Sequence, residues 1–290
     1  MFYKKIATLL ILSSFIVSCS QNIQNNETLL NKIATFDSKK KADVSKPDVI
    51  KMISPNSNER PEGTKISAVV LHHTAMAADA KAVGNFFANP NAKVSSHYIV
   101  DRTGYIVQPV EDELRAWHAG KSGFQGMANV NNFSIGIEIC NLGDSVEPYP
   151  DAEYDSIIRL VAYLVKTYNL KSEDITRHKD IAIPAGRKID TSDNFSVKRV
   201  LDGVEALLNG NYNPPAPQQP APVELPLFKD VIVKKGEFSL KILADIYLDD
   251  ENRWQELKLA NPNIPVSSIQ VGTQIKIPTT YAFFDMLFKK

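Results

Sequence analysis

A proline-rich segment late in the chain limits the possible folds more than any other part of the sequence. It reads NPPAPQQPAPVELP at residues 213–226. Proline fixes φ and lacks a backbone N–H, so such a run stays extended and semi-rigid. The segment predicts a linker that divides the 290 residues into a larger domain at 61–212 and a small one at 227–280, followed by a tail at 281–290.

The N-terminus has the pattern of an export signal. Lys4 and Lys5 precede an apolar run at 6–17. This run is too short to span a bilayer comfortably, and it is typical of the core of a secretory signal. It ends at Cys19 in a pattern that resembles a bacterial lipobox, in which the cysteine becomes the lipidated first residue. An ordinary signal with a chance cysteine is the alternative, but we expect a signal peptide at 1–18 and lipidation of Cys19.

The segment after the signal is rich in Asn, Lys and Ser. We expect residues 19–60 to form a tether between the lipid and the fold, with some helix near 27–36. Ser20 follows Cys19, and in a Gram-negative host this residue favours the outer membrane over the inner one. The expected location is therefore the periplasmic face of the outer membrane, reached through the lipid anchor.

Charge and cysteine content narrow the class of protein. The 33 basic and 33 acidic residues balance, so no global field favours nucleic acid as a partner, and we expect a monomer. The chain has two cysteines, Cys19 and Cys140. If Cys19 carries lipid, the fold must be held by its core without a disulfide. Cys140 lies in an apolar strand pattern and is expected to be a small buried side chain.

Apolar runs and helical periodicity outline the larger domain. Asp151 is the expected N-cap of its longest helix. Strands that alternate with helices predict an α/β fold with a mixed central sheet flanked by helices. The expected strands cover 65–74 and 133–140, the hairpin covers 96–110 with its turn at Asp101–Gly104, and the helices cover 79–89, 151–170 and 196–208.

All five histidines fall in the larger domain, at His72, His73, His97, His118 and His178. His72 and His73 end an apolar run, and side chains alternate across a strand, so only one of the two can face a given site. A histidine in this position is more often structural than catalytic. Glu138 interrupts a second apolar run, IGIEI. A buried carboxylate is costly, so Glu138 either pairs with a cation or performs chemistry at a cleft.

The segment RHKDIAIPAGRKID, residues 177–190, is predicted to be a loop because Pro184 and Gly186 break regular structure. Two interpretations are open for this loop: a polar surface turn, or half of a metal site. In the second interpretation His178 and Asp190 meet His72 around one zinc ion, which leaves a fourth position for water. A nearby Glu could then move the proton of that water, and a Lys two residues before the Asp could stabilise the oxyanion. These are the groups that amide hydrolysis requires, although their spacing alone is not specific.

Five ordered motifs make the pattern specific. They are VVLHHTA, VSSHYIVDRTGYIVQPV, RAWHAG, SIGIEI and RHKDIA…GRKID. Over about residues 61–210 they resemble zinc-dependent N-acetylmuramoyl-L-alanine amidases of type 2, which share their fold with phage-lysozyme amidases and peptidoglycan recognition proteins. The resemblance implies cleavage of the amide between the lactyl group of N-acetylmuramic acid and L-Ala of the stem peptide. Intact and anhydro muramic acid are both possible substrates.

The resemblance also implies roles for individual residues. His72, the first of the pair, corresponds to a zinc ligand, together with His178 and Asp190. Glu138 matches the catalytic acid/base of the family, and Lys188 matches its transition-state lysine.

Other matched positions concern the substrate cleft. RAWHAG lines that cleft in relatives, so Trp117 and His118 are expected to contact substrate, and His97 is expected to border the site in either a substrate-binding or a structural role. The loop is two residues longer than in close relatives, which puts the position of Lys188 in doubt. Asp180 is a rival carboxylate that the family pattern places outside the metal shell.

The small domain predicts strand, helix, helix and strand from VIVKKGEFSLKILADIY (231–247), RWQELKLANPNI (253–264) and VGTQIKIP (271–278). It resembles a LysM module, which implies binding of the N-acetylglucosamine-containing glycan of peptidoglycan. The family usually has Asp-Thr where this chain has Glu237-Phe238. The alternative is a small packing domain without a ligand.

Three functions therefore compete. The first is a lipid-anchored zinc amidase that cuts peptidoglycan, with the small domain raising its local concentration on the wall. The second is a non-catalytic peptidoglycan-binding lipoprotein of the same fold, which would be expected to lose a zinc ligand. The third is a purely structural envelope lipoprotein. Retention of all three ligand types and of Glu138 favours the enzyme.

Overall fold

The computed structural model describes residues 44–216, 227–248 and 250–288. The expected signal peptide, Cys19 and most of the proline-rich segment lie outside the described residues. Among the residues that are described, no helix is both long and apolar enough to cross a membrane.

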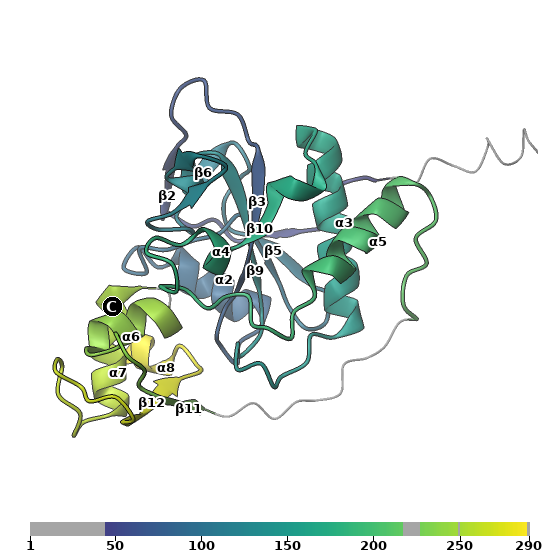
Figure 1. Cartoon of the computed structure of the whole chain (residues 1–290). Helices are drawn as coiled ribbons and strands as arrows, with labels where there is room; N and C mark the ends of the chain where they lie inside the picture. Colours follow the sequence, from purple (N-terminus) through teal and green to yellow (C-terminus); the bar gives the residue numbers. More distant parts are fainter. Residues whose placement is uncertain (1–43, 217–226, 249, 289–290) are drawn as a thin grey trace, which may run out of the picture.

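A six-stranded mixed sheet forms the centre of the larger domain, with strand order β1-β5-β4-β9-β3-β10 (Figure 1). All neighbouring strands run parallel except β4 and β5, which form an antiparallel hairpin. The sheet therefore confirms the predicted mixed α/β architecture. Its strands are β1 Ile50–Lys51, β3 Ala68–His73, β4 Tyr98–Val100, β5 Ile106–Gln108, β9 Ser134–Ile139 and β10 Ile175–Arg177.

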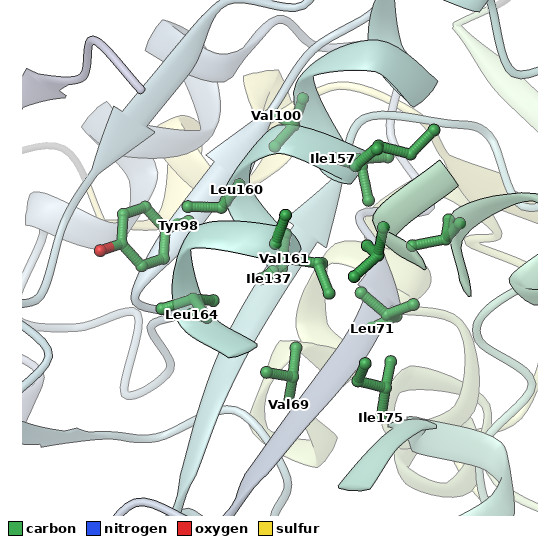
Figure 2. Packing of buried hydrophobic residues seen from close by; sticks show 14 of the residues in the cluster. Val69, Leu71, Tyr98, Val100, Ile137, Ile157, Leu160, Val161, Leu164 and Ile175 are labelled. Carbon is green, nitrogen blue, oxygen red and sulfur yellow. The ribbon is translucent and has the colours of Figure 1, made fainter. Parts of the chain in front are cut away.

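Two helices, α3 Asp151–Tyr168 and α5 Val197–Leu208, cover one face of this sheet (Figure 1). Figure 2 shows alternate strand residues such as Leu71 and Ile137 in one apolar cluster with Leu160 of α3. Because side chains alternate along a strand, the residues next to Leu71 and Ile137 point to the opposite face. The site residues His72 and Glu138 lie there.

The opposite face is covered by α2 Ala80–Ala88, α4 His178–Ile181 and smaller hairpins. Asp79 caps α2 by accepting from the Ala82 N–H at 2.8 Å. Strand β2 Ser57–Glu59 pairs with β6 Leu114–Ala116, and β7 Gly123–Phe124 pairs with β8 Met127–Ala128. Short 3-10 turns lie at η1 Val130–Asn132 and η2 Ser172–Asp174.

Three local expectations differ from the structure. Residues 44–60, expected within the tether, instead supply β1 and β2 to the folded domain. Pro150, not Asp151, occupies the N-cap of α3, and Asp151 pairs with Arg199 at 2.6 Å. The first residues of the predicted loop 177–190 end β10 and form the single-turn helix α4. The first and third differences involve elements of two to four residues, which are too short to leave a clear pattern in the sequence.

The C-terminal unit pairs β11 Phe228–Ile232 antiparallel with β12 Gln274–Pro278. Between these strands lie α6 Leu240–Tyr247, η3 Glu251–Arg253 and α7 Trp254–Ala260. The order of strands and helices is the one expected from the sequence. The predicted tail is mostly a helix, α8 Ala282–Phe288.

The C-terminal unit packs against the larger domain beside α2 (Figure 1). Phe86 of α2 stacks on Tyr281 with ring centroids 4.3 Å apart and meets Phe284 edge-on at 4.7 Å. The guanidinium of Arg253 lies 4.8 Å from the centre of the Phe86 ring. The two units therefore share one continuous apolar cluster, and the C-terminal unit is packed against the larger domain.

Candidate metal centre

Three side chains from separate parts of the chain converge on the free face of the sheet. His72 ends β3, His178 begins α4, and Asp190 follows in the loop beyond α4. His72 Nδ1 lies 3.1 Å from His178 Nδ1 and 2.9 Å from Asp190 Oδ2, and His178 Nδ1 lies 3.1 Å from the same oxygen. All three residues are at most 7% exposed. The structure thus brings together the three expected ligands around one point.

A hydrogen-bonded chain orients the His72 ring. Ser134 Oγ donates its single hydrogen to the Val130 carbonyl at 2.7 Å, so it accepts from His118 Nε2 at 3.1 Å. His118 Nδ1 is then an acceptor, and His72 Nε2 donates to it at 3.0 Å. The lone pair of His72 therefore lies on Nδ1, the atom that faces the cluster.

His178 is oriented in the same sense by the backbone. Its Nε2 donates to the Ala119 carbonyl at 3.1 Å, which leaves its lone pair on Nδ1 as well. The Lys179 N–H donates to the Asp190 carbonyl at 2.7 Å and thereby ties the loop to α4. Both imidazoles thus point an acceptor nitrogen at the Asp190 carboxylate.

The electrostatics of the cluster suit a cation. Burial lowers the pKa of His118 well below its ordinary value, so this ring is neutral at pH 7. Two imidazole acceptors and a carboxylate at such short separations repel one another unless positive charge lies between them. Two His nitrogens and one carboxylate oxygen are a donor set that zinc accepts, at about 2.0–2.2 Å each.

Glu138 stands next to this cluster. It is the register partner of His72 on the adjacent parallel strand β9, so both side chains project from the same face. It is 6% exposed. The second histidine of the pair, His73, points away from this face, and its Nδ1 accepts from the Ser192 N–H at 3.0 Å. Strand alternation therefore separates the two histidines as the sequence required.

A cavity of about 140 Å³ opens beside the cluster. Trp117 lines it, and its indole N–H donates to Asn58 Oδ1 at 2.7 Å. Lys188 also lines it, although only 2% of its side chain is exposed. The other lining residues are Lys93, Val94, His118, Gly120, Asn131, His178, Arg187 and Asp245.

His118 and His97, which were expected at the substrate cleft, are both held by hydrogen bonds inside the protein. His118 is 2% exposed, and both of its ring nitrogens are engaged by His72 and Ser134. His97 is fully buried, with Nδ1 accepting from the Gly136 N–H at 2.9 Å and Nε2 donating to the Leu114 carbonyl at 3.1 Å. Burial and the neighbouring Arg60 lower the pKa of His97 to about 3. His97 therefore has the structural role that was the alternative, and His118 supports a ligand.

Other positions fit their expected environments. Asp180 pairs with Arg177 at 2.7 Å and lies outside the cluster. Cys140 is fully buried. The roles of Ser134 and Gly136 were not predicted from the sequence. Gly136 is required because a Cβ at this position would lie 2.4 Å from His118 Cγ. The glycine in SIGIEI was the available signal, because it makes room for that ring.

Comparison with known proteins identifies the family of the chain. The chain matches the family described as N-acetylmuramoyl-L-alanine amidase over residues 62–193. It is 34% identical over 169 residues to 1,6-anhydro-N-acetylmuramyl-L-alanine amidase AmpD of Haemophilus influenzae, covering 52% of this chain and 90% of that protein. The chain belongs to this amidase family.

Two further comparisons are a partial match to a second curated amidase and a match to a solved structure. N-acetylmuramoyl-L-alanine amidase AmiD of Escherichia coli is 31% identical over 132 residues, which covers 41% of this chain and 46% of that protein. A crystal structure of a selenomethionine AmpD derivative is 29% identical and covers 57% of this chain and 96% of that chain, with a TM-score of 0.48.

Proposed function

We propose that this chain is an N-acetylmuramoyl-L-alanine amidase that hydrolyses the amide between N-acetylmuramic acid, or its anhydro form, and L-Ala of the stem peptide. One observation carries the proposal: His72 and His178 each direct an acceptor nitrogen at the Asp190 carboxylate, beside Glu138, in a chain of the amidase family. The relatives named as 1,6-anhydro-N-acetylmuramyl-L-alanine amidases support inclusion of the anhydro form.

We assign zinc to this site, held by His72, His178 and Asp190. Two neutral imidazoles and one carboxylate, with a position left for water, are a catalytic zinc set. When bound, zinc supplies a polarised amide carbonyl and a water of lowered pKa.

Residues of the chain provide proton transfer, charge stabilisation and orientation of the ligands. Glu138 accepts the proton of the attacking water and delivers it to the departing amide nitrogen of L-Ala. The Lys188 ammonium stabilises the negative charge that develops on the carbonyl oxygen. His118 and Ser134 keep His72 in the tautomer that binds the ion, and Trp117 offers an aromatic face to the substrate at the cavity.

The proposal extends to the rest of the chain. We assign the pattern ending at Cys19 to a lipid anchor on the periplasmic face of the outer membrane, and the C-terminal unit to a LysM-like glycan-binding module. The lipobox-like sequence supports the anchor, and the strand, helix, helix, strand order supports the module. The enzyme would act as a monomer whose module raises its concentration at the wall.

Mass spectrometry of digested peptidoglycan tests the activity. The chain from Ser20 onward is incubated with peptidoglycan fragments, with and without a zinc chelator. Free stem peptides that begin at L-Ala and appear only with zinc are the expected result. Fragments that stay bound and uncut would instead favour the non-catalytic peptidoglycan-binding lipoprotein.

A further inference from the structure

The C-terminal unit contributes a side chain to the cavity beside the metal centre. Asp245 of α6 lines this cavity together with Lys188. Lys188 Nζ donates to the Asp245 carbonyl at 2.5 Å and lies 3.2 Å from Asp245 Oδ1. Arg187 Nη1 is 3.2 Å from the same carboxylate oxygen. Arg187 and Lys188, two consecutive cations of the loop that carries Asp190, are therefore both bound by one residue of the C-terminal unit.

The place of Asp245 in its helix is unfavourable without these partners. Asp245 lies in the last turn of α6, which ends at Tyr247. A carboxylate near a helix C-terminus meets the negative end of the macrodipole, and aspartate is a weak helix former. The carbonyls of the last turn also lack helical N–H partners. A lysine ammonium at this point satisfies both the carbonyl and the carboxylate.

Contacts other than these ion pairs also hold the C-terminal unit against the larger domain. The units are joined through the aromatic contacts of Phe86 with Tyr281 and Phe284, and the Ala77 N–H donates to the Thr279 carbonyl at 2.5 Å. An apolar interface of this kind opposes relative domain motion. Asp245 thus reaches the cavity from a unit that is packed against the larger domain through apolar contacts.

Resting on the proposed function, we propose that Asp245 is a positioning residue of the amidase site: the C-terminal unit holds the Lys188 ammonium at the cavity wall. A lysine side chain loses rotamer freedom when it is fixed in one place. Prior fixation by Asp245 removes that loss from the chemical step. The C-terminal unit then completes the catalytic domain in addition to any glycan binding.

Kinetics of the full-length zinc-loaded enzyme test this role. Asp245→Ala is expected to lower kcat about 10- to 100-fold, as misplacement of a catalytic group does, while KM changes less than about twofold. Asp245→Asn keeps the side-chain volume and should show the same direction of change, and Asp245→Glu should recover part of the loss. In a Lys188→Ala background, Asp245→Ala should have no further effect, because both changes act through one group.

A second readout does not require turnover. An amine-reactive reagent is applied to the metal-free and zinc-loaded full chain, and labelling of Lys188 is followed by peptide mass spectrometry. Asp245→Ala should label Lys188 about tenfold faster than wild type, because the buried ammonium loses its carboxylate partner. Asp202→Ala is the matched control, because it breaks the exposed pair with Lys198 on α5 and should leave Lys188 labelling and kcat unchanged.

The outcomes separate this inference from the proposed function. An active wild type whose Asp245→Ala variant matches it in kcat and in Lys188 labelling overturns the positioning role alone. A folded, zinc-loaded wild type that releases no stem peptide overturns the amidase assignment, and the positioning role in catalysis with it. Faster labelling together with lower kcat and little change in KM supports the inference.

Discussion

At the scale of single residues, the metal centre depends on groups that do not touch the ion. His118 sets the tautomer of His72, and Ser134 sets that of His118. Outer partners of this kind are worth a substantial part of the metal affinity. The candidate site is therefore a chain of hydrogen bonds that begins at the Val130 carbonyl and ends at the ligand.

His118→Ala is expected to weaken zinc binding about 10- to 100-fold while the fold is kept. The variant removes the acceptor that fixes the His72 proton on Nε2. Competition with a chromogenic chelator measures the affinity. Trp117→Ala is the control, since Trp117 lines the same cavity and bonds to Asn58. Equal zinc affinities of the two variants would contradict the role of His118 in orienting His72.

Glu138→Ala should keep zinc and fold but lower kcat about 10²- to 10⁴-fold, the contribution of a general acid–base group. Its strand register places it beside His72 without making it one of the three convergent ligands. Bound zinc and stem-peptide release are measured on the same preparation. The companion variants His72→Ala and His178→Ala should lose the zinc itself. A Glu138→Ala enzyme with wild-type turnover would remove Glu138 from the mechanism.

At the scale of elements, the helices and strands with long apolar or periodic sequence patterns could be predicted, and the shortest strands could not. The core strands β3 and β9 and the helix α3 carry long apolar or periodic patterns, and each was found. The strands β1 and β2 have two and three residues and form only by pairing with distant strands. The three candidate metal ligands could be predicted from sequence motifs. The position of Asp245 beside Lys188 could not, because it results from the packing of the C-terminal unit against the larger domain, which no local sequence pattern indicates.

The turn of the β4–β5 hairpin shows how one element fixes another. Gly104 has φ +82° and lies against α3, where a Cβ would be 2.7 Å from the Ala152 carbonyl oxygen. Gly104→Ala combines backbone strain with overpacking and should cost about 2–4 kcal/mol of unfolding free energy. Gly126→Ala is the control, with φ +78° and open space around its Cβ. Denaturant unfolding should show the larger loss for Gly104→Ala, and equal losses would mean that the contact with α3 is unimportant.

Glu153 in the first turn of α3 makes stability depend on pH. It is fully buried, and its two carboxylate oxygens have no hydrogen-bond partner among the described residues. Burial raises the pKa of Glu153 well above 4.5, Arg102 opposes the shift, and Glu147 adds to it. The folded state thus keeps its proton while the unfolded chain loses it above its own pKa. Stability from this group is present at low pH and falls as pH rises from the unfolded pKa toward the raised folded one.

Glu153→Gln should remove this dependence. Relative to wild type, the variant should gain about 1.4 kcal/mol of unfolding free energy per pH unit within that window. Urea unfolding between pH 4.5 and 7 measures the difference, with the exposed Glu173→Gln as control. A constant difference across this range would show that Glu153 ionises as readily in the folded protein as in the unfolded one.

At the scale of the whole molecule, the two units are expected to unfold together because one apolar cluster joins them. Phe86 is 5% exposed and contacts both Tyr281 and Phe284, with Arg253 over its ring. Phe86→Ala should therefore cost about 3–5 kcal/mol and split a single thermal transition into two, because it removes the aromatic contact between units.

Calorimetry distinguishes this coupling from independent folding. Phe238→Ala is the control, since Phe238 is 59% exposed on the C-terminal unit and should leave one transition in place. Undocking in Phe86→Ala should also release Asp245 from Lys188, so the variant should label Lys188 faster in the same way as Asp245→Ala. Two separate transitions in the wild type would mean that the units fold independently. The apolar interface would then be too weak to hold α6 at the cavity, and Lys188 would depend on its ion pair alone.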